Sequence, residues 1–269
     1  MKILALANLD GEPVPRAALW DVSAASGVTA IAFAGNVLPP RPVSAREAQR
    51  LYTRFFETLA AMGVPVAVVP GAYDTHARLF HQAIRASGQS APLVVVDRTV
   101  APLGDVLVGG LGGLIGAETD AEAEGIAACG RALRQTHLTL APLALQGHGG
   151  PWLLLVHMPP RSTVVDRHDG RHVGCRAINR LIAEVRATVT ICGFARDGQG
   201  KDEIDGALVV NPGPLAQGRY ALIDLDLRVV RFGLLPRPGR RGPRPGQTGT
   251  RVLERKCDDP RPLTVMDVA

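Results

Sequence analysis

The chain of 269 residues is long enough to form one large domain with a substantial core, or two small ones. Hydrophobic residues make up 46% of it but aromatic residues only 4%, so the core must consist mainly of Leu, Val, Ile and Ala. The net charge is +5, of which residues 236–269 carry +4 through eight Lys/Arg and four Asp/Glu. The basic balance of the chain therefore says little about its folded part.

Nothing in the cysteine spacing suggests a disulfide framework, and no two cysteines form a CxxC pair; they are Cys129, Cys175, Cys192 and Cys257. No apolar run approaches the ~18–20 residues of a membrane span. The apolar start, Met1–Ala7, lacks the charged and long apolar regions of a signal peptide. We therefore expect a cytoplasmic protein without a membrane partner, and the sequence leaves its oligomeric state open.

Short apolar runs bounded by polar residues, Gly or Pro are typical of buried strands. We expect strands at residues 2–7, 28–34, 64–69, 93–97, 105–108, 153–157, 188–192, 207–210, 219–225 and 228–235, the last two forming a hairpin. The glycine-dense residues 109–116 lack the Lys-Ser/Thr of a P-loop. We interpret them as a turn with close backbone packing.

Amphipathic helices are expected between these strands. One at residues 14–26 would bury Leu19, Trp20 and Val22. The next would begin with a capping box of Ser44 and Glu47, contain Leu51, Phe55 and Leu59, which recur every four residues, and end before Gly63. A third helix, capped by Asp74 or Thr75, would run to Gly88. Two more would span residues 119–136 and 175–187. After Leu235 no apolar period remains, so we predict a domain at 1–235 and a disordered, Pro/Gly/Arg-rich tail at 236–269.

Five of the predicted strands end in polar loops. His157 follows the apolar run Leu153–Val156 and precedes two prolines within residues 157–160. The other four loops carry Asn8 and Asp10, Asn36, Tyr73 and Asp74, and residues 193–197. Open α/β sheets bind their ligands at the carboxyl ends of strands, so we expect a site where these loops meet.

This order of loops resembles the calcineurin-like metallophosphoesterase family, in particular its small bacterial and archaeal branch. The resemblance covers nearly all of residues 1–235 and is strongest at LLLVHMPP, HVGCRAINRLIAEV and ALVVNPGPLAQGRYALIDL. It implies an α/β fold in four layers, with two mixed β-sheets face to face and helices flanking both.

The family binds two divalent metals through five loop motifs, and this sequence departs from nearly all of them. Asn8 and Asp10 replace the first motif, Asp-x-His, and Asn36 replaces the carboxylate that bridges both metals. The fourth motif, a histidine after a strand, is kept as His157. Under this resemblance Asn8, Asp10, Asn36 and His157 are vestigial metal-site residues.

The third motif, Gly-Asn-His-Asp, corresponds here to Gly71-Ala72-Tyr73-Asp74. Ala72 has no donor atom for a metal. Tyr73 stands at the position of the general-acid histidine, next to Asp74, so these two are the implied catalytic positions. A tyrosine with a pKa near 10 protonates a leaving group poorly but still donates a hydrogen bond. An aromatic cap over a closed site is an equally good interpretation of Tyr73.

The fifth motif, Gly-His-x-His, becomes Gly193-Phe194-Ala195-Arg196. Arginine stays protonated and is not a metal ligand. We hypothesise that Arg196 replaces a cation and pairs with Asp10, and that Phe194 fills the other metal position. The alternative is an Arg196 side chain that points to solvent.

The sequence therefore predicts a phosphoesterase-fold protein with a largely lost two-metal site, inactive or strongly impaired, whose cleft binds an anion at Arg196, such as a nucleotide or another phosphorylated small molecule. One alternative is an active phosphodiesterase or phosphatase with one weakly bound Mn, Fe or Zn ion at Asn8, Asp10, Asn36 and His157. A nucleic-acid-associated subunit that uses the basic tail is another. A relocated metal site would combine His157, His168 or His172 with Asp166 or Asp169.

Overall fold

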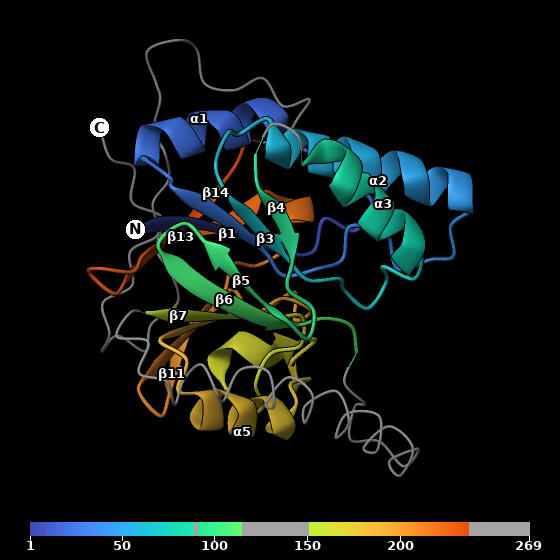
Figure 1. The fold of residues 1–269 in the computed structure, drawn as a ribbon. Coiled ribbons are helices and arrows are strands. Elements are labelled where there is room, and N and C mark those ends of the chain that lie inside the picture. Colours follow the sequence, from blue (N-terminus) through green and yellow to red (C-terminus); the bar gives the residue numbers. More distant parts are fainter. Residues whose placement is uncertain (89–90, 115–150, 237–269) are drawn as a thin grey trace.

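The computed structural model describes residues 1–88, 91–114 and 151–236. In this part of the chain two six-stranded sheets face each other, and helices cover the outer face of each (Figure 1). The predicted four-layer α/β sandwich with two mixed sheets is confirmed. The predicted helix at 119–136 and the tail from residue 237 lie outside the described residues.

The first sheet is mixed. Its strand order is β14 (Val229–Leu234), β13 (Arg219–Asp224), β1 (Lys2–Leu6), β2 (Ala30–Phe33), β3 (Val66–Val68) and β4 (Leu93–Val95). Strands β1 to β4 are parallel, while β13 is antiparallel to both of its neighbours. The carboxyl ends of the parallel strands therefore lie along one edge of this sheet.

The second sheet is built in the same way. Its order is β11 (Gly200–Ile204), β12 (Ala207–Asn211), β10 (Val189–Ile191), β7 (Trp152–Val156), β6 (Val106–Leu111) and β5 (Val100–Leu103). The four inner strands are parallel, and the outermost strands β5 and β11 are antiparallel to them. Each sheet thus has a parallel centre that can present loops at its carboxyl edge.

Helices α1 (Arg16–Ser26), α2 (Ala45–Ala60) and α3 (Ala77–Ser87) cover the first sheet, and α5 (Arg176–Val185) covers the second (Figure 1). The α5 helix buries Ile178, Leu181, Ile182 and Val185, as its periodicity predicts. Within the described residues no helix has both the length and the apolar character needed to cross a membrane. Cys175 and Cys192 are buried free thiols.

The period of two along each strand divides the core into three layers. On β2, for example, Ile31 and Phe33 face the helices, whereas Ala30 and Ala32 face the second sheet. Small alanines recur on this inner face of the first sheet, while the second sheet opposes them with Leu and Val side chains such as Leu153 and Leu155. This size difference allows the two sheets to pack closely.

Several predicted elements need correction. Strands β5 and β11 were not expected, because Pro102 interrupts the first and the sequence of the second is largely polar. Gly109–Leu111 continue strand β6 instead of forming a turn. The expected close packing is present there, since a Cβ at Gly110 would lie 2.7 Å from the Leu155 carbonyl oxygen.

The helix ends also differ from expectation. Trp20 is 51% exposed instead of buried. Ser44 accepts a hydrogen bond from the Glu47 N–H at 3.2 Å, but the Glu47 carboxylate pairs with Arg41 and does not complete the capping box. His76, and neither Asp74 nor Thr75, stands at the N-cap of α3.

Candidate active site

Five loops meet at the carboxyl edge of the two sheets, as the polar strand ends predict. Those after β1, β2 and β3 come from the first sheet, and those after β7 and β10 from the second. Backbone bonds tie them together: the Asn8 N–H donates to the Gly35 carbonyl at 2.9 Å, and the Gly193 N–H donates to the His157 carbonyl at 3.0 Å. The site is thus formed between the sheets and not on one of them.

Asp74 organises two of these loops. Its buried carboxylate accepts hydrogen bonds from the backbone N–H groups of Asn36, Val37, Leu38 and Gly71 at 2.7–3.1 Å. Burial raises the pKa of Asp74, and these four donors oppose the shift by stabilising the charged form. The carboxylate is engaged with four backbone N–H groups and holds these loops together, while the catalytic role expected for Asp74 stays a prediction.

The same two loops approach so closely that glycine is required. A Cβ at Gly71 would lie 2.1 Å from the Asn36 backbone nitrogen and 2.2 Å from its Oδ1. Gly35 has a φ of +85°, and its Cβ would lie 2.8 Å from His157 Nδ1. These contacts hold Asn36 and His157 at the centre of the site.

The two asparagine side chains are bonded to each other and to the backbone. Asn36 Nδ2 donates to Asn8 Oδ1 at 3.3 Å, and the Phe194 N–H donates to the same oxygen at 3.2 Å. Asn36 Oδ1 accepts the Tyr73 N–H at 3.0 Å. Both amide oxygens are therefore occupied, whereas the buried Nδ2 of Asn8 has no hydrogen-bond partner among the described residues.

His157 is fully buried at the end of β7. Its Nδ1 lies 2.7 Å from the Ala34 carbonyl oxygen, which can only accept, so Nδ1 carries the proton and Nε2 keeps a free lone pair. Burial lowers the pKa of His157 to about 4, which keeps the ring neutral at pH 7. Nε2 has no partner within the described residues. The Phe194 ring packs edge-on against the imidazole, with centroids 5.6 Å apart.

Arg196 and Asp10 form the ion pair that the sequence hypothesis required. Arg196 Nη2 lies 2.8 Å from Asp10 Oδ2, with the Asp10 side chain only 7% exposed and the Arg196 side chain 35% exposed. Burial raises the pKa of Asp10 to about 6, and Arg196 partly opposes this shift. Arg196 therefore does not point away into solvent; it holds the carboxylate and still reaches the surface.

Four of the site residues have a left-handed backbone. The φ angles of Asn8, Asp10 and Asn36 are +54°, +55° and +65°, which Asn and Asp tolerate well. Phe194 has a φ of +58°, an uncommon conformation for a bulky side chain. Strained backbone of this kind is concentrated at functional sites.

The remaining two predicted positions line the edge of the site. Ala72 and Tyr73 are half-buried, and the Tyr73 ring packs against the core under α2. Ala72 adds no donor atom. The structure therefore brings together all of the predicted site residues, and of the two carboxylates among them Asp74 is committed to backbone donors whereas Asp10 is not.

The loop after β7 forms a separate cluster. Asp166 is fully buried and accepts bonds from the N–H groups of Ser162, Thr163 and Gly174 and from His172 Nδ1 at 2.6–3.1 Å. Its loop contains a short hairpin of β8 (Arg167–His168) and β9 (Arg171–His172). Asp166 and His172 thus hold the loop in place.

One group in the described residues brings three potential metal ligands together: His168, Asp169 and Asp197. His168 Nδ1 faces Asp197 at 3.7 Å, whereas its Nε2 faces Asp169 at 3.8 Å. The two carboxylates thus address opposite nitrogens of the ring, an arrangement that also suits a simple charge pairing across a turn. Two pairs of the residues expected for a relocated metal site are adjacent, His172 with Asp166 at 2.6 Å and His168 with Asp169 at 3.8 Å. Sequence analysis did not single out Asp197.

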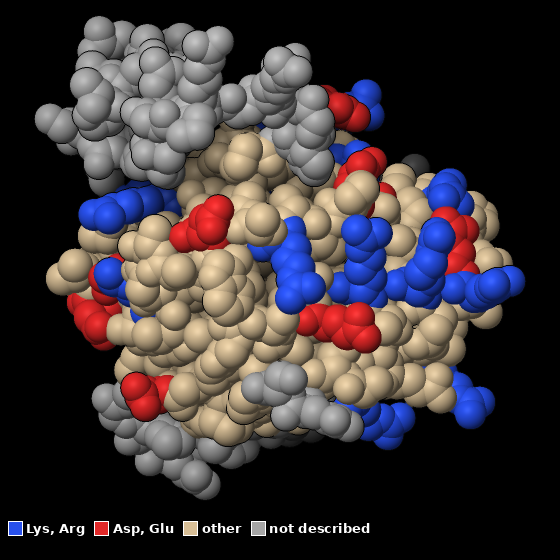
Figure 2. All heavy atoms as spheres, turned by 90° about the horizontal axis from the view of Figure 1, so that it is seen from above, with Lys and Arg blue, Asp and Glu red and all other residues tan. Residues whose placement is uncertain are grey.

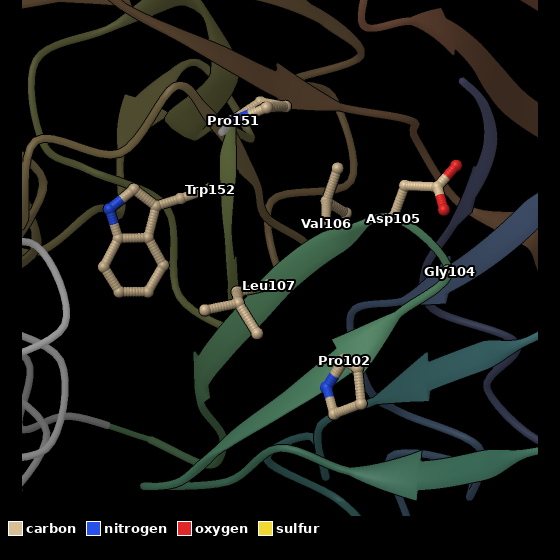
Figure 3. Close-up of a pocket in the computed structure, with 7 residues that line it drawn as sticks. All are labelled: Pro102, Gly104, Asp105, Val106, Leu107, Pro151 and Trp152. Atoms are coloured by element: carbon tan, nitrogen blue, oxygen red, sulfur yellow. The ribbon is translucent and has the colours of Figure 1, made fainter. Parts of the chain in front are cut away.

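A hollow also lies at the other end of the second sheet (Figure 3). It is formed by the β5–β6 hairpin and the start of β7, and its lining is Pro102, Gly104, Asp105, Val106, Leu107, Pro151 and Trp152. None of the predicted site residues contributes to it. Because Trp152 begins β7 and His157 follows its end, the hollow is separate from the candidate site.

Comparison with known proteins agrees with the observed fold. A family model described as metallophosphoesterase, calcineurin superfamily, matches residues 39–235. The protein TT1561 of Thermus thermophilus is similar in structure, with a TM-score of 0.68, 25% identity, and coverage of 87% of this chain and 99% of that one. No curated protein matches the sequence.

Two further solved structures support the fold. One crystal structure has a TM-score of 0.71 and 23% identity over 87% of this chain and 99% of its own. A dimetal phosphatase from Danio rerio has a TM-score of 0.54 and 13% identity over 87% of this chain and 92% of its own.

Proposed function

The chain belongs to the metallophosphoesterases of the calcineurin superfamily, and we propose that it keeps the scaffold of that family without its two-metal centre. In this proposal the protein binds a phosphate-type anion at Arg196 and hydrolyses phosphate esters weakly or not at all. The observation that carries the proposal is the ion pair between Arg196 and Asp10 at 2.8 Å.

The donor set does not fit two divalent cations. Two cations ~3.5–4 Å apart require anionic ligands to offset their repulsion. Of the two carboxylates among the predicted site residues, Asp74 is bonded to backbone N–H groups and Asp10 is paired with Arg196. The amide oxygens of Asn8 and Asn36 already accept backbone or amide N–H groups. Among the described residues of the site, this leaves His157 Nε2 and Asp10 Oδ1 as potential ligand atoms without a partner, which are too few for two cations.

Arg196 supplies the positive charge that the family obtains from metal. Its guanidinium has five N–H donors in a planar fork, and the contact with Asp10 occupies only one side of it. A phosphate-type anion would bind the remaining donors through charge-assisted hydrogen bonds. Tyr73, at the edge of the same site, would donate a hydrogen bond to such an anion instead of protonating a leaving group.

The first test combines metal content with phosphate binding. We expect protein exposed to Mn²⁺, Fe²⁺ and Zn²⁺ to retain less than one equivalent after desalting, and to bind inorganic phosphate by calorimetry. Arg196→Gln should abolish phosphate binding, while Arg171→Gln, an exposed arginine on the β8–β9 hairpin, should not. Two retained metal equivalents would contradict the proposal, as would phosphate binding that survives Arg196→Gln.

A reconstruction experiment tests the loss of the metal centre from the opposite direction. We would restore the family motifs by the combined changes N8D, D10H, N36D, A72N, Y73H, F194H and R196H. Because the backbone of the loops is already in place, we expect the restored protein to bind about two Mn²⁺ per chain and to hydrolyse bis-p-nitrophenyl phosphate. A folded variant without bound metal would show that the scaffold itself has diverged.

The second candidate function is a reduced enzyme with one weakly bound metal. The free Nε2 of His157 favours it, since this buried nitrogen and the Asp10 carboxylate belong to the same group of loops and both are possible ligands. It would require Arg196 to release Asp10. One equivalent of Mn²⁺ that is lost in both His157→Gln and Asp10→Asn, with Mn²⁺-dependent phosphodiesterase activity, would favour this function over the first.

A nucleic-acid-associated role through residues 236–269 is the third candidate. The eight Lys/Arg of this segment support it, because contacts to phosphates dominate nonspecific affinity for nucleic acids. Replacement of its arginines by glutamine should then remove most of the salt-dependent DNA or RNA binding of the full chain. Unchanged binding would exclude the tail as the contact surface.

A further inference from the structure

The exposed surface of helices α2 and α3 carries an arginine face, which we define as Arg46, Arg50, Arg54, Arg78 and Arg85. All five side chains are exposed. Among the residues that the structure describes, none of them forms an ion pair, whereas Arg41 and Glu47 at the start of α2 pair with each other. Figure 2 shows a row of basic side chains crossing the helical face of the molecule.

The spacing of these arginines aligns them. Arg46, Arg50 and Arg54 recur every four residues on α2, so they lie on one side of the helix at intervals of about 6 Å. Arg78 and Arg85, seven residues apart, share one side of α3. The two helices lie side by side (Figure 1), and Phe80 of α3 packs edge-on against α2 aromatic rings.

The aromatic residues of these helices face the core instead of the surface. Tyr52, Phe55, Phe56 and Phe80 are at most 1% exposed, so the arginine face presents no Phe, Tyr or Trp ring on which a base could stack, and its exposed ring is the small imidazole of His81. A surface of this composition favours contacts with phosphates over stacking on unpaired bases. It also lacks an exposed apolar group for insertion into a membrane, since the apolar side of both helices is buried.

From this charge pattern we infer that the arginine face binds the phosphate backbone of double-stranded nucleic acid without regard to sequence. The regular rows of guanidinium groups complement the regular negative charge of a duplex. Both helices begin near the candidate site, because α2 follows the Asn36 loop and α3 follows the Asp74 loop. The inference stands on the helices alone and does not depend on the function proposed for Arg196.

The test measures binding of the full chain to a fluorescent 20-bp DNA duplex by anisotropy at several salt concentrations. The variant R46Q/R50Q/R54Q should bind at least about tenfold more weakly than the wild type at 100 mM salt. Its plot of log affinity against log salt should be less steep by about two to three, since each lost phosphate contact lowers the slope by about 0.9.

The matched control is R171Q/R176Q/R180Q, which removes the same charge from exposed arginines on and near α5, on the other side of the sandwich. It should bind the duplex like the wild type. Equal weakening by both triple variants would overturn the inference in favour of general charge attraction. No weakening by the α2 variant, or binding to phosphatidylserine vesicles without binding to the duplex, would also overturn it.

Discussion

Two sets of buried polar groups in this protein differ in how completely they are satisfied. The carboxylates of Asp74 and Asp166 each accept several backbone N–H groups, which close the loops after β3 and β7. In the centre of the candidate site, Asn8 Nδ2 and His157 Nε2 have no hydrogen-bond partner among the described residues, and Asp10 has only its ion pair with Arg196.

The satisfied carboxylates hold the loops in place, whereas the unsatisfied groups are the ones that the loops present to the site. The carboxylates of Asp74 and Asp166 hold the loops through backbone N–H groups, whereas the central groups point their polar atoms into the site without such partners. Each buried polar atom that stays unsatisfied costs about 1–3 kcal/mol. The open groups are therefore kept at an energetic cost, which is typical of a site that binds a ligand or water.

The largest loss of stability is expected from the substitution Asp74→Ala. This change would leave the N–H groups of Asn36, Val37, Leu38 and Gly71 without their acceptor in the core of the site. We expect the free energy of unfolding to fall by about 4 kcal/mol, near the upper end of single substitutions. Urea denaturation at pH 7 measures it, and a loss below about 1.5 kcal/mol would show that the loops close without Asp74.

The next effect is a pair of opposing pH dependences inside the site. The folded pKa of His157 is lowered from 6.5 to about 4, so its contribution to stability is lost as the pH falls from 6.5 to 4. The folded pKa of Asp10 is raised from 3.8 to about 6, so its contribution is fully present below pH 4 and is lost as the pH rises through 6. Each group changes the free energy of unfolding by about 3 kcal/mol across this pH range, and because the two changes have opposite signs they largely cancel.

Single substitutions should separate the pH-dependent contributions of Asp10 and His157 to stability, which cancel in the wild type. Between pH 6.5 and 4.5, Asp10→Asn should lose stability more steeply than the wild type, because only the His157 term remains. His157→Gln should lose less than the wild type, or gain. Urea denaturation across this pH range measures both, and parallel curves for the two variants would contradict the burial of these groups.

A smaller effect follows from the ion pair. Arg196 lowers the pKa of Asp10 against the stronger effect of burial. Arg196→Gln should therefore raise the pKa of Asp10 above 6, by about one unit, or about 1.4 kcal/mol. A ¹³C NMR titration of the Asp10 carboxyl carbon measures this shift, and an unchanged pKa would show that the two side chains do not interact in solution.

The smallest effect is expected from Asp97→Ala. Its half-buried carboxylate accepts one backbone N–H, that of Gly112, at 2.9 Å. Its pairing with Arg98 is exposed and adds little. We expect a loss of about 1 kcal/mol by urea denaturation. A loss equal to that of Asp74→Ala would mean that the number of backbone donors does not decide the cost.

The arrangement of the candidate site followed from the strand pattern. Apolar runs that end in polar loops predicted the meeting of Asn8, Asn36 and His157, because the carboxyl ends of parallel strands share one edge. The contact between Arg196 and Asp10 needed the family resemblance as well, since the two residues lie far apart in the chain and leave no local signal. The arginine face was also present as an i, i+4 repeat on α2, but sequence analysis did not use it.

Other features were decided only by the tertiary structure. Strands β5 and β11 carry no strand pattern, and they form because the edges of β6 and β12 offer unpaired backbone groups. Asp74 resembles a helix cap in sequence, yet its partners are mainly the N–H groups of residues 36–38, which the β2 strand brings close. The sequence by itself determined which segments are buried and where they end, since both follow from local hydrophobicity. Which groups satisfy a buried charge depends on segments far apart in the chain, and only the packing of the two sheets determines their distance.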